Sequence, residues 1–187
     1  MKIITMLENK INIDDENQTR LDQLFKSKGP QIILLVGLPG SGKSTFVNNY
    51  RLKKHAFVAS TDNIIEEYAK AHGMDYNEAF KKLDFKKDVE SKMKIQIRQA
   101  ANKGENIIID QTNMTDKSRQ SKMSMVPKHY ERYAIVLWPP IEVVRERLLK
   151  REKETGKSIP ETVIQRMLSS YIPPDFREGF KDIIFVK

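Results

Sequence analysis

The sequence predicts an α/β domain in which a mostly parallel, doubly wound five-stranded sheet carries helices on both faces and a short helical lid. Short apolar runs alternate along the chain with segments whose apolar residues recur at helical spacing. The apolar runs are continuous rather than alternating with polar residues, which is typical of parallel strands covered on both faces. A glycine-rich turn directly follows the first core run, 31–36, and a helical pattern follows the turn.

The order of the expected elements supports this fold. The expected strands are 31–36, 56–59, 107–110, 133–138 and 183–186. In the longest helical segment, 85–100, apolar residues recur at steps of three or four, and Gly104 supplies the stop. Thr115 is a favourable N-cap, and Pro160 is typical of a helix start. Ligands should gather where such strands end.

Length and composition predict one main domain. The chain has 187 residues, enough for one sizeable core. We expect residues 1–30 to form an N-terminal extension, with an edge strand in 1–7 and a helix in 19–26, and residues 31–187 to form the core domain. The sequence shows no membrane span, no secretory signal pattern and no cysteine, so we expect a cytoplasmic protein.

Basic residues exceed acidic ones and gather in one segment. The formal net charge of +8 favours a polyanionic partner such as nucleic acid. The basic residues that could follow a nucleic-acid backbone are Lys81, Lys82, Lys86, Lys87, Lys92, Lys94 and Arg98. A solvated amphipathic helix explains the same residues equally well.

The glycine-rich turn has the spacing of a phosphate-binding loop, or P-loop. Its residues are Gly37, Leu38, Pro39, Gly40, Ser41, Gly42, Lys43, Ser44 and Thr45. Glycines let backbone N–H groups surround an anion, and the following helix adds its positive end. Lys43 can reach the β- and γ-phosphates of a nucleotide, and the Ser44 hydroxyl can bind Mg²⁺. The alternative is a chance glycine-rich turn. We expect ATP and Mg²⁺ as cofactors.

Asp62 follows the expected strand 56–59 and is a candidate catalytic carboxylate. At that position it would face the γ-phosphate across the edge of the sheet, where it could accept a hydroxyl proton and orient the attacking oxygen. The alternative is structural, because Thr61 or Asp62 would serve well as the N-cap of a helix over 63–71.

Asp110, Thr112 and Asn113 follow the strand 107–110. An acid at this place can hold the water shell of a metal ion, and the next polar residues can bind substrate. An ordinary strand-to-helix turn is the alternative, since the same residue types favour turns.

The charged segment 145–153 is expected to be a helix that ends in a turn at 154–158. An arginine at its tip can close over a triphosphate and neutralise charge in the transition state. We assign this role to Arg151. The other charged residues of the segment fit a solvated helix face.

Taken in order, these motifs resemble the kinase module of polynucleotide 5′-kinases, as in phage end-healing enzymes and nucleic-acid repair proteins. The motifs are GLPGSGKST, the STD of 60–62, the DQTN of 110–113 with Arg119 beyond it, and the segment 148–167. The resemblance covers roughly residues 31–170. It implies that Asp62 is the general base, that Lys43 and Ser44 hold phosphate and metal, and that Arg151 and Arg119 contact phosphates or substrate.

The sequence departs from that family at two places. Ile65 stands where the family often has an arginine that binds the acceptor, and Glu154-Thr155 stand where a second lid arginine is common. The DQTN turn and the lid also resemble the kinase-like domain of the nuclear ribonucleoprotein U family, which lacks the equivalent of Asp62.

The motifs predict an ATP- and Mg²⁺-dependent kinase. The resemblance implies that its acceptor is the 5′-hydroxyl of DNA or RNA, in a bacterium or a phage-infected cell. One alternative is a kinase for a small metabolite or for a hydroxymethylated base in phage DNA. Another is a nucleotide-regulated RNA-binding module without transfer activity.

Overall fold

Five parallel strands form one sheet in the computed structural model, which describes residues 14–53 and 55–186. The strand order is β2-β3-β1-β4-β5, and every pairing is parallel. The strands are β1 (Gln31–Val36), β2 (Ala56–Ala59), β3 (Asn106–Ile109), β4 (Glu131–Leu137) and β5 (Asp182–Val186). All five expected strands are confirmed, with ends shifted by one or two residues. The expected edge strand in 1–7 lies outside the described residues.

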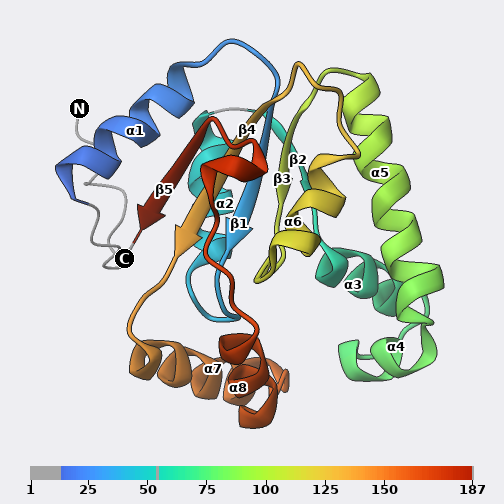
Figure 1. Cartoon of the computed structure of the whole chain (residues 1–187). Coiled ribbons are helices and arrows are strands. Elements are labelled where there is room, and N and C mark those ends of the chain that lie inside the picture. Colours follow the sequence, from blue (N-terminus) through green and yellow to red (C-terminus); the bar gives the residue numbers. More distant parts are fainter. Residues whose placement is uncertain (1–13, 54, 187) are drawn as a thin grey trace.

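Helices connect these strands (Figure 1). They are α1 (Asp15–Lys26), α2 (Lys43–Lys53), α3 (Thr61–Ala71), α4 (Tyr76–Lys82), α5 (Ser91–Asn102), α6 (Asp116–Met123), α7 (Ile141–Thr155) and α8 (Glu161–Ser169), with a π-helical segment η2 (Phe85–Glu90) and a 3₁₀ turn η3 (Phe176–Glu178). The expectation of one regular helix over 85–100 is wrong in its first part, because 85–90 is π-helical and α5 begins at Ser91.

The two faces of the sheet carry separate apolar cores. On one face, Ile33 and Leu35 of β1 pack with residues of α1 and α2. On the other face, Ile32 and Leu34 pack with residues of α3, α5 and α6. Every residue of β1 is buried, as expected for a central strand covered on both sides. Helices on both faces of the sheet are therefore confirmed.

The lid lies beyond the carboxyl ends of the strands, where α7 and α8 cross below the sheet in Figure 1. Leu38 and Met114, from the loops after β1 and β3, pack there with Val144 of α7 and Ile164 of α8. This small core ties both lid helices to the loops at the strand ends. Helix α7 ends at Gly156, whose φ of 71° is left-handed. Among the described residues, no helix is long and apolar enough to cross a membrane.

Candidate active site

The turn between β1 and α2 is shaped by glycines that no other residue could replace without movement. A Cβ on Gly37 would lie 2.4 Å from the carbonyl oxygen of Leu137, so the backbone of β4 passes too close for any side chain. Gly40 has a φ of 81°, and Arg147 of α7 donates a hydrogen bond of 3.2 Å to its carbonyl oxygen. The turn is thus held by both the sheet and the lid.

Lys43 lies inside this turn. Its Nζ donates to the carbonyl oxygens of Gly37 and Leu38, at 3.1 and 2.7 Å. Burial lowers the pKa of Lys43 to about 8, although the nearby carboxylates of Asp110 and Asp62 act in the opposite direction. A buried ammonium with only neutral hydrogen-bond partners has strong potential to bind an anion.

The turn fits a phosphate chain. Besides Lys43, it contains the buried hydroxyl of Ser41, which has no hydrogen-bond partner in the described part of the chain. Ser44 and Thr45 are exposed in the first turn of α2. The described residues include no cluster of three His, Cys, Asp or Glu side chains that could hold a metal by themselves. A divalent cation here would therefore share Ser44 with the phosphates of a nucleotide.

Asp62 lies in the first turn of α3, just beyond β2. The N-cap of this helix is Ser60, whose side chain accepts from the backbone N–H of Asn63. The capping role considered for Thr61 or Asp62 is therefore wrong, because α3 begins at Thr61, two residues before the expected start at residue 63. The Asp62 side chain keeps 51% of its surface exposed and is not used for capping.

Two side chains from other elements approach the Asp62 carboxylate. The Tyr76 hydroxyl, at the start of α4, donates to Oδ1 at 2.8 Å. Nη2 of Arg151, near the end of α7, lies 3.8 Å from Oδ2. Arg151 also acts electrostatically on Lys43 and Asp110. The structure thus brings together four predicted site residues from four segments: Lys43, Asp62, Asp110 and Arg151.

Asp110 stands at the carboxyl end of β3. Its backbone N–H donates to the carbonyl oxygen of Ala59 at 2.9 Å, which continues the pairing of β2 with β3. Burial raises the pKa of the Asp110 carboxyl, and the charge of Lys43 opposes this shift. A carboxylate in this position could accept hydrogen bonds from the water bound to a metal ion.

Sequence reasoning missed a contact between the lid and α3–α4. Lys157, just after Gly156, forms an ion pair with Glu66 of α3. Its Nζ also lies 3.9 Å from the centre of the Tyr76 ring. The sequence did not indicate this contact, because 81 positions separate Tyr76 from Lys157.

Two residues of the turn after β3, Thr112 and Asn113, support β1 and the P-loop. The carbonyl oxygen of Thr112 accepts from the N–H of Gly37 at 3.0 Å. The amide of Asn113 donates to the carbonyl oxygen of Leu35 at 2.7 Å, and the residue is only 1% exposed. Direct substrate contact by the Asn113 side chain, expected from the sequence, is at odds with this burial.

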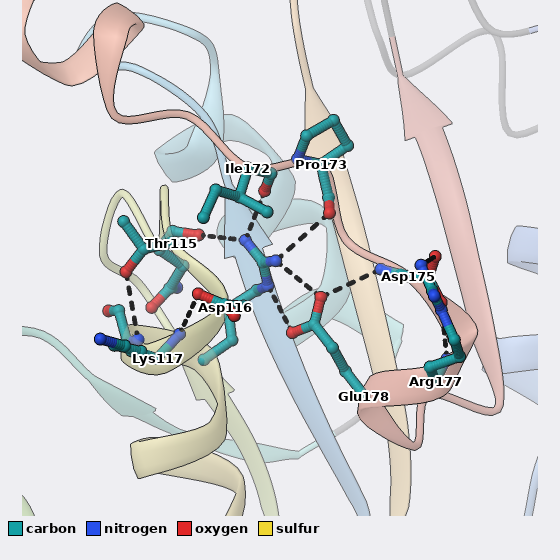
Figure 2. A network of polar contacts seen from close by, with 11 residues as sticks. Thr115, Asp116, Lys117, Ile172, Pro173, Asp175, Arg177 and Glu178 are labelled. Atoms are coloured by element: carbon teal, nitrogen blue, oxygen red, sulfur yellow. Dashed lines mark hydrogen bonds and ion pairs between the residues drawn. The ribbon is translucent and has the colours of Figure 1, made fainter.

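Arg119 is also placed away from the site. Carbonyl groups of Ile172 and Pro173 and the carboxylate of Glu178 surround one guanidinium group (Figure 2). That group belongs to Arg119, which is fully buried, pairs with Glu178 at 2.6 Å and also donates to the carbonyl oxygen of Asn113. The expected substrate contact of Arg119 is therefore corrected to a structural role: it joins the turn after β3 to the segment between α8 and β5.

The departures noted in the sequence have clear positions. Ile65 is 1% exposed and packs in the core beneath α3, so its side chain does not face the strand ends as an acceptor-binding residue would. Glu154 and Thr155 are exposed at the end of α7.

The chain is similar to known proteins over most of its length. A protein-family model described as an AAA domain matches residues 32–174. The L-seryl-tRNA(Sec) kinase of Methanococcus maripaludis is 30% identical over 147 residues, 76% of this chain and 53% of that protein. Heterogeneous nuclear ribonucleoprotein U-like protein 2 of Homo sapiens is 26% identical over 150 residues, 78% of this chain and 20% of that protein. A protein of Acanthamoeba polyphaga mimivirus, named "Putative bifunctional polynucleotide phosphatase/kinase", is 25% identical over 179 residues, 91% of this chain and 37% of that protein.

Solved structures share the fold. A chain of the Pnkp1/Rnl/Hen1 RNA repair complex has a TM-score of 0.59 and 24% identity, over 78% of this chain and 45% of that chain. A chain of the PezAT chromosomal toxin–antitoxin system of Streptococcus pneumoniae has a TM-score of 0.63 and 19% identity, over 93% and 77%. The resemblance to polynucleotide kinases and to the ribonucleoprotein U family is confirmed. This chain spans about a fifth to about half of the curated relatives' length.

Proposed function

Because this chain belongs to the AAA domain family and has a P-loop kinase-like fold, we propose that it transfers the γ-phosphate of ATP to a hydroxyl group. We further propose that the acceptor is the 5′-hydroxyl of a DNA or RNA strand. One observation carries the proposal: Arg151 lies 3.8 Å from the Asp62 carboxylate, and the charges of both residues act on the pKa of Lys43 in the P-loop. A loop that only binds nucleotide needs neither a half-exposed carboxylate nor a lid arginine.

Each residue has a role that follows from its position. When bound, ATP with Mg²⁺ supplies the phosphoryl group and a cation that offsets its charge. Lys43 and the N–H groups of the P-loop would hold the phosphates, and Ser44 and Asp110 would hold the cation and its bound water. Asp62 accepts the proton of the acceptor hydroxyl as that oxygen bonds to phosphorus and ADP leaves. During this step, Arg151 stabilises the charge that builds on the transferring group.

The contact between the lid and α3–α4 supports this placement of Asp62 and Arg151. Lys157 links α7 to α3 through Glu66 and covers the Tyr76 ring, while Tyr76 holds Asp62 by its hydroxyl. Closing of the lid and positioning of the base therefore depend on the same side chains. Lid closure of this kind excludes water from a transfer site.

The basic surface and one relative's name support a nucleic-acid acceptor. Exposed lysines of α4, η2 and α5 lie on the side of the molecule that carries α3, and the mimivirus relative is named for a polynucleotide. The burial of Ile65 favours the alternative, a kinase for a small metabolite or a hydroxymethylated base, because no arginine is present at that position. The ribonucleoprotein relative favours an RNA-binding module without transfer.

The test is a transfer assay with γ-³²P-ATP and Mg²⁺ on 5′-hydroxyl DNA and RNA oligonucleotides, hydroxymethylated duplexes and a panel of small hydroxyl compounds. We expect label on a 5′ end, and none with Lys43→Ala. Label only on another acceptor would move the assignment to that class. Tight RNA binding with no labelled product from any acceptor would overturn the kinase proposal.

A further inference from the structure

A cavity of about 360 Å³ opens between η2–α5, the turn after β3 and α6. This volume lies in the range that holds small ligands in proteins. Its wall includes Gln111 and Thr112, and the Thr112 carbonyl accepts from the P-loop at Gly37. One turn of the chain therefore forms both the wall of this cavity and the support of the phosphate-binding loop.

Two lysines face the cavity, and one of them is largely buried. Lys122 of α6 donates from Nζ to the Asn113 Oδ1 at 2.9 Å and to the Ser118 Oγ at 2.7 Å. An ammonium has three donors, so within the described chain one donor of Lys122 remains for a ligand. Lys94 of α5 lines the same cavity, and the acid in the lining is Glu90. The cavity thus carries excess positive charge.

Burial lowers the pKa of Lys122 to about 8, against the charge of Glu90 and together with that of Arg119. A desolvated ammonium of this kind gains more from an anion than an exposed lysine does.

The lining also includes a hydrogen-bond acceptor and apolar side chains. The Gln111 Oε1 is buried and has no hydrogen-bond partner among the described residues, although Gln111 Nε2 lies 3.4 Å from the Thr61 hydroxyl, beside Asp62. Met93 and Met125 also line the cavity. A ligand for this space therefore combines an anion, a hydrogen-bond donor and an apolar face. A nucleotide unit has all three.

We propose that this cavity is the acceptor subsite: Lys122 and Lys94 bind the phosphate on the 3′ side of the acceptor's first nucleoside, and Gln111 accepts from its sugar or base. This inference rests on the proposed function, because it assumes an acceptor strand that presents its 5′-hydroxyl to Asp62. It adds the residues that would select a phosphate-bearing acceptor over a free nucleoside.

A binding experiment tests the subsite without any transfer. Adenosine 3′-monophosphate is titrated into the full chain by calorimetry, with adenosine as the phosphate-free probe. We expect Lys122→Met and Lys94→Met each to weaken binding of the monophosphate at least tenfold and to leave adenosine binding unchanged. Lys117→Met is the matched control, because Lys117 is an exposed lysine on the same helix outside the cavity. Lys122→Arg, which keeps the charge, should retain most of the affinity.

The transfer assay separates the two proposals. Both the kinase and the subsite are supported by one pair of results. Wild type must label a 5′-hydroxyl dinucleotide, and Lys122→Met must raise the KM for that dinucleotide at least tenfold without changing kcat or ATP affinity. If wild type labels the dinucleotide but neither lysine variant changes KM or monophosphate affinity, the subsite is refuted while the kinase remains. If wild type binds the monophosphate through these lysines but labels no polynucleotide, the proposed function fails and the cavity is a nucleotide site. No binding of the monophosphate to wild type refutes the subsite in every case.

Discussion

The Tyr76 hydroxyl donates a 2.8 Å hydrogen bond to the Oδ1 of Asp62, so the first residue of α4 holds the carboxylate in the first turn of α3. Burial raises the pKa of the Tyr76 phenol, and the Asp62 charge and the hydrogen bond raise it further. The phenol therefore stays protonated and remains a donor. This contact fixes one oxygen of Asp62 and leaves the other toward Arg151.

Removal of this donor should impair transfer while leaving nucleotide binding intact. Tyr76→Phe keeps the ring under Lys157 but loses the hydrogen bond, so we expect kcat to fall about tenfold, equivalent to about 1.4 kcal/mol. Steady-state kinetics with an ATP titration measures this. Tyr68→Phe is the control, because its ring stacks on His72 away from the site. Equal kcat values for Tyr76→Phe and wild type would show that the contact does not position the base.

Arg151 should act on the rate rather than on nucleotide affinity. Arg151→Ala removes the lid charge nearest Asp62, and arginines that stabilise phosphoryl transfer contribute on the order of 10³ in kcat. Single-turnover kinetics with saturating ATP measures the step. Arg145→Ala on the same helix, where Arg145 pairs with exposed Glu161, should keep the wild-type rate. A rate within twofold of wild type for Arg151→Ala would remove Arg151 from the mechanism.

The buried pair of Arg119 and Glu178 should govern stability. Glu178→Gln leaves a fully buried guanidinium without its counter-charge, so we expect a loss of about 3–5 kcal/mol in the free energy of unfolding. Urea denaturation measures it, with Asp175→Asn as a control, because Asp175 pairs with exposed Arg177 on the same turn. A loss below about 1 kcal/mol combined with lost activity would restore Arg119 as a functional residue.

Lys122 should make stability depend on pH. In the folded chain its pKa is about 8, whereas its ordinary value is 10.5. Between these values the unfolded chain binds more protons, so the free energy of unfolding should rise as pH increases from about 8 to about 9.5. Lys43 has a similar shift, so Lys122→Met should reduce this rise rather than abolish it. Urea midpoints at pH 7.5 and 9.5 compare the two proteins. An identical rise in both would mean that Lys122 is not desolvated.

Much of the fold followed from local patterns. Continuous apolar runs located all five strands, because parallel strands covered by helices on both faces are apolar along most of their length. Thr115 caps α6 as expected, since its hydroxyl accepts from the N–H of Ser118 within one turn. The glycines of the P-loop could also be predicted from the sequence. Gly40 and Gly42 have positive φ angles, and the backbone of Leu137 leaves no room for a side chain at Gly37.

The parts that could not be predicted depend on distant partners. Arg119 was expected to contact substrate because the resemblance to polynucleotide kinases implied that role. The burial of its side chain could not be predicted, because its partner Glu178 lies 59 positions away in the sequence. The Asn113 side chain likewise has a distant partner, because its amide donates to the carbonyl oxygen of Leu35 on β1. The cap at Ser60 was missed because three consecutive residues, 60–62, all have side chains that favour capping.

The most direct test of the account is the Asp62→Asn variant in a single-turnover transfer assay with γ-³²P-ATP, alongside ATP binding by calorimetry. The amide keeps the shape of the side chain but cannot accept the hydroxyl proton. We expect ATP affinity within threefold of wild type and a transfer rate lower by a factor on the order of 10²–10⁴. Transfer at the wild-type rate would contradict the assignment of Asp62 as the base, and with it the proposed mechanism.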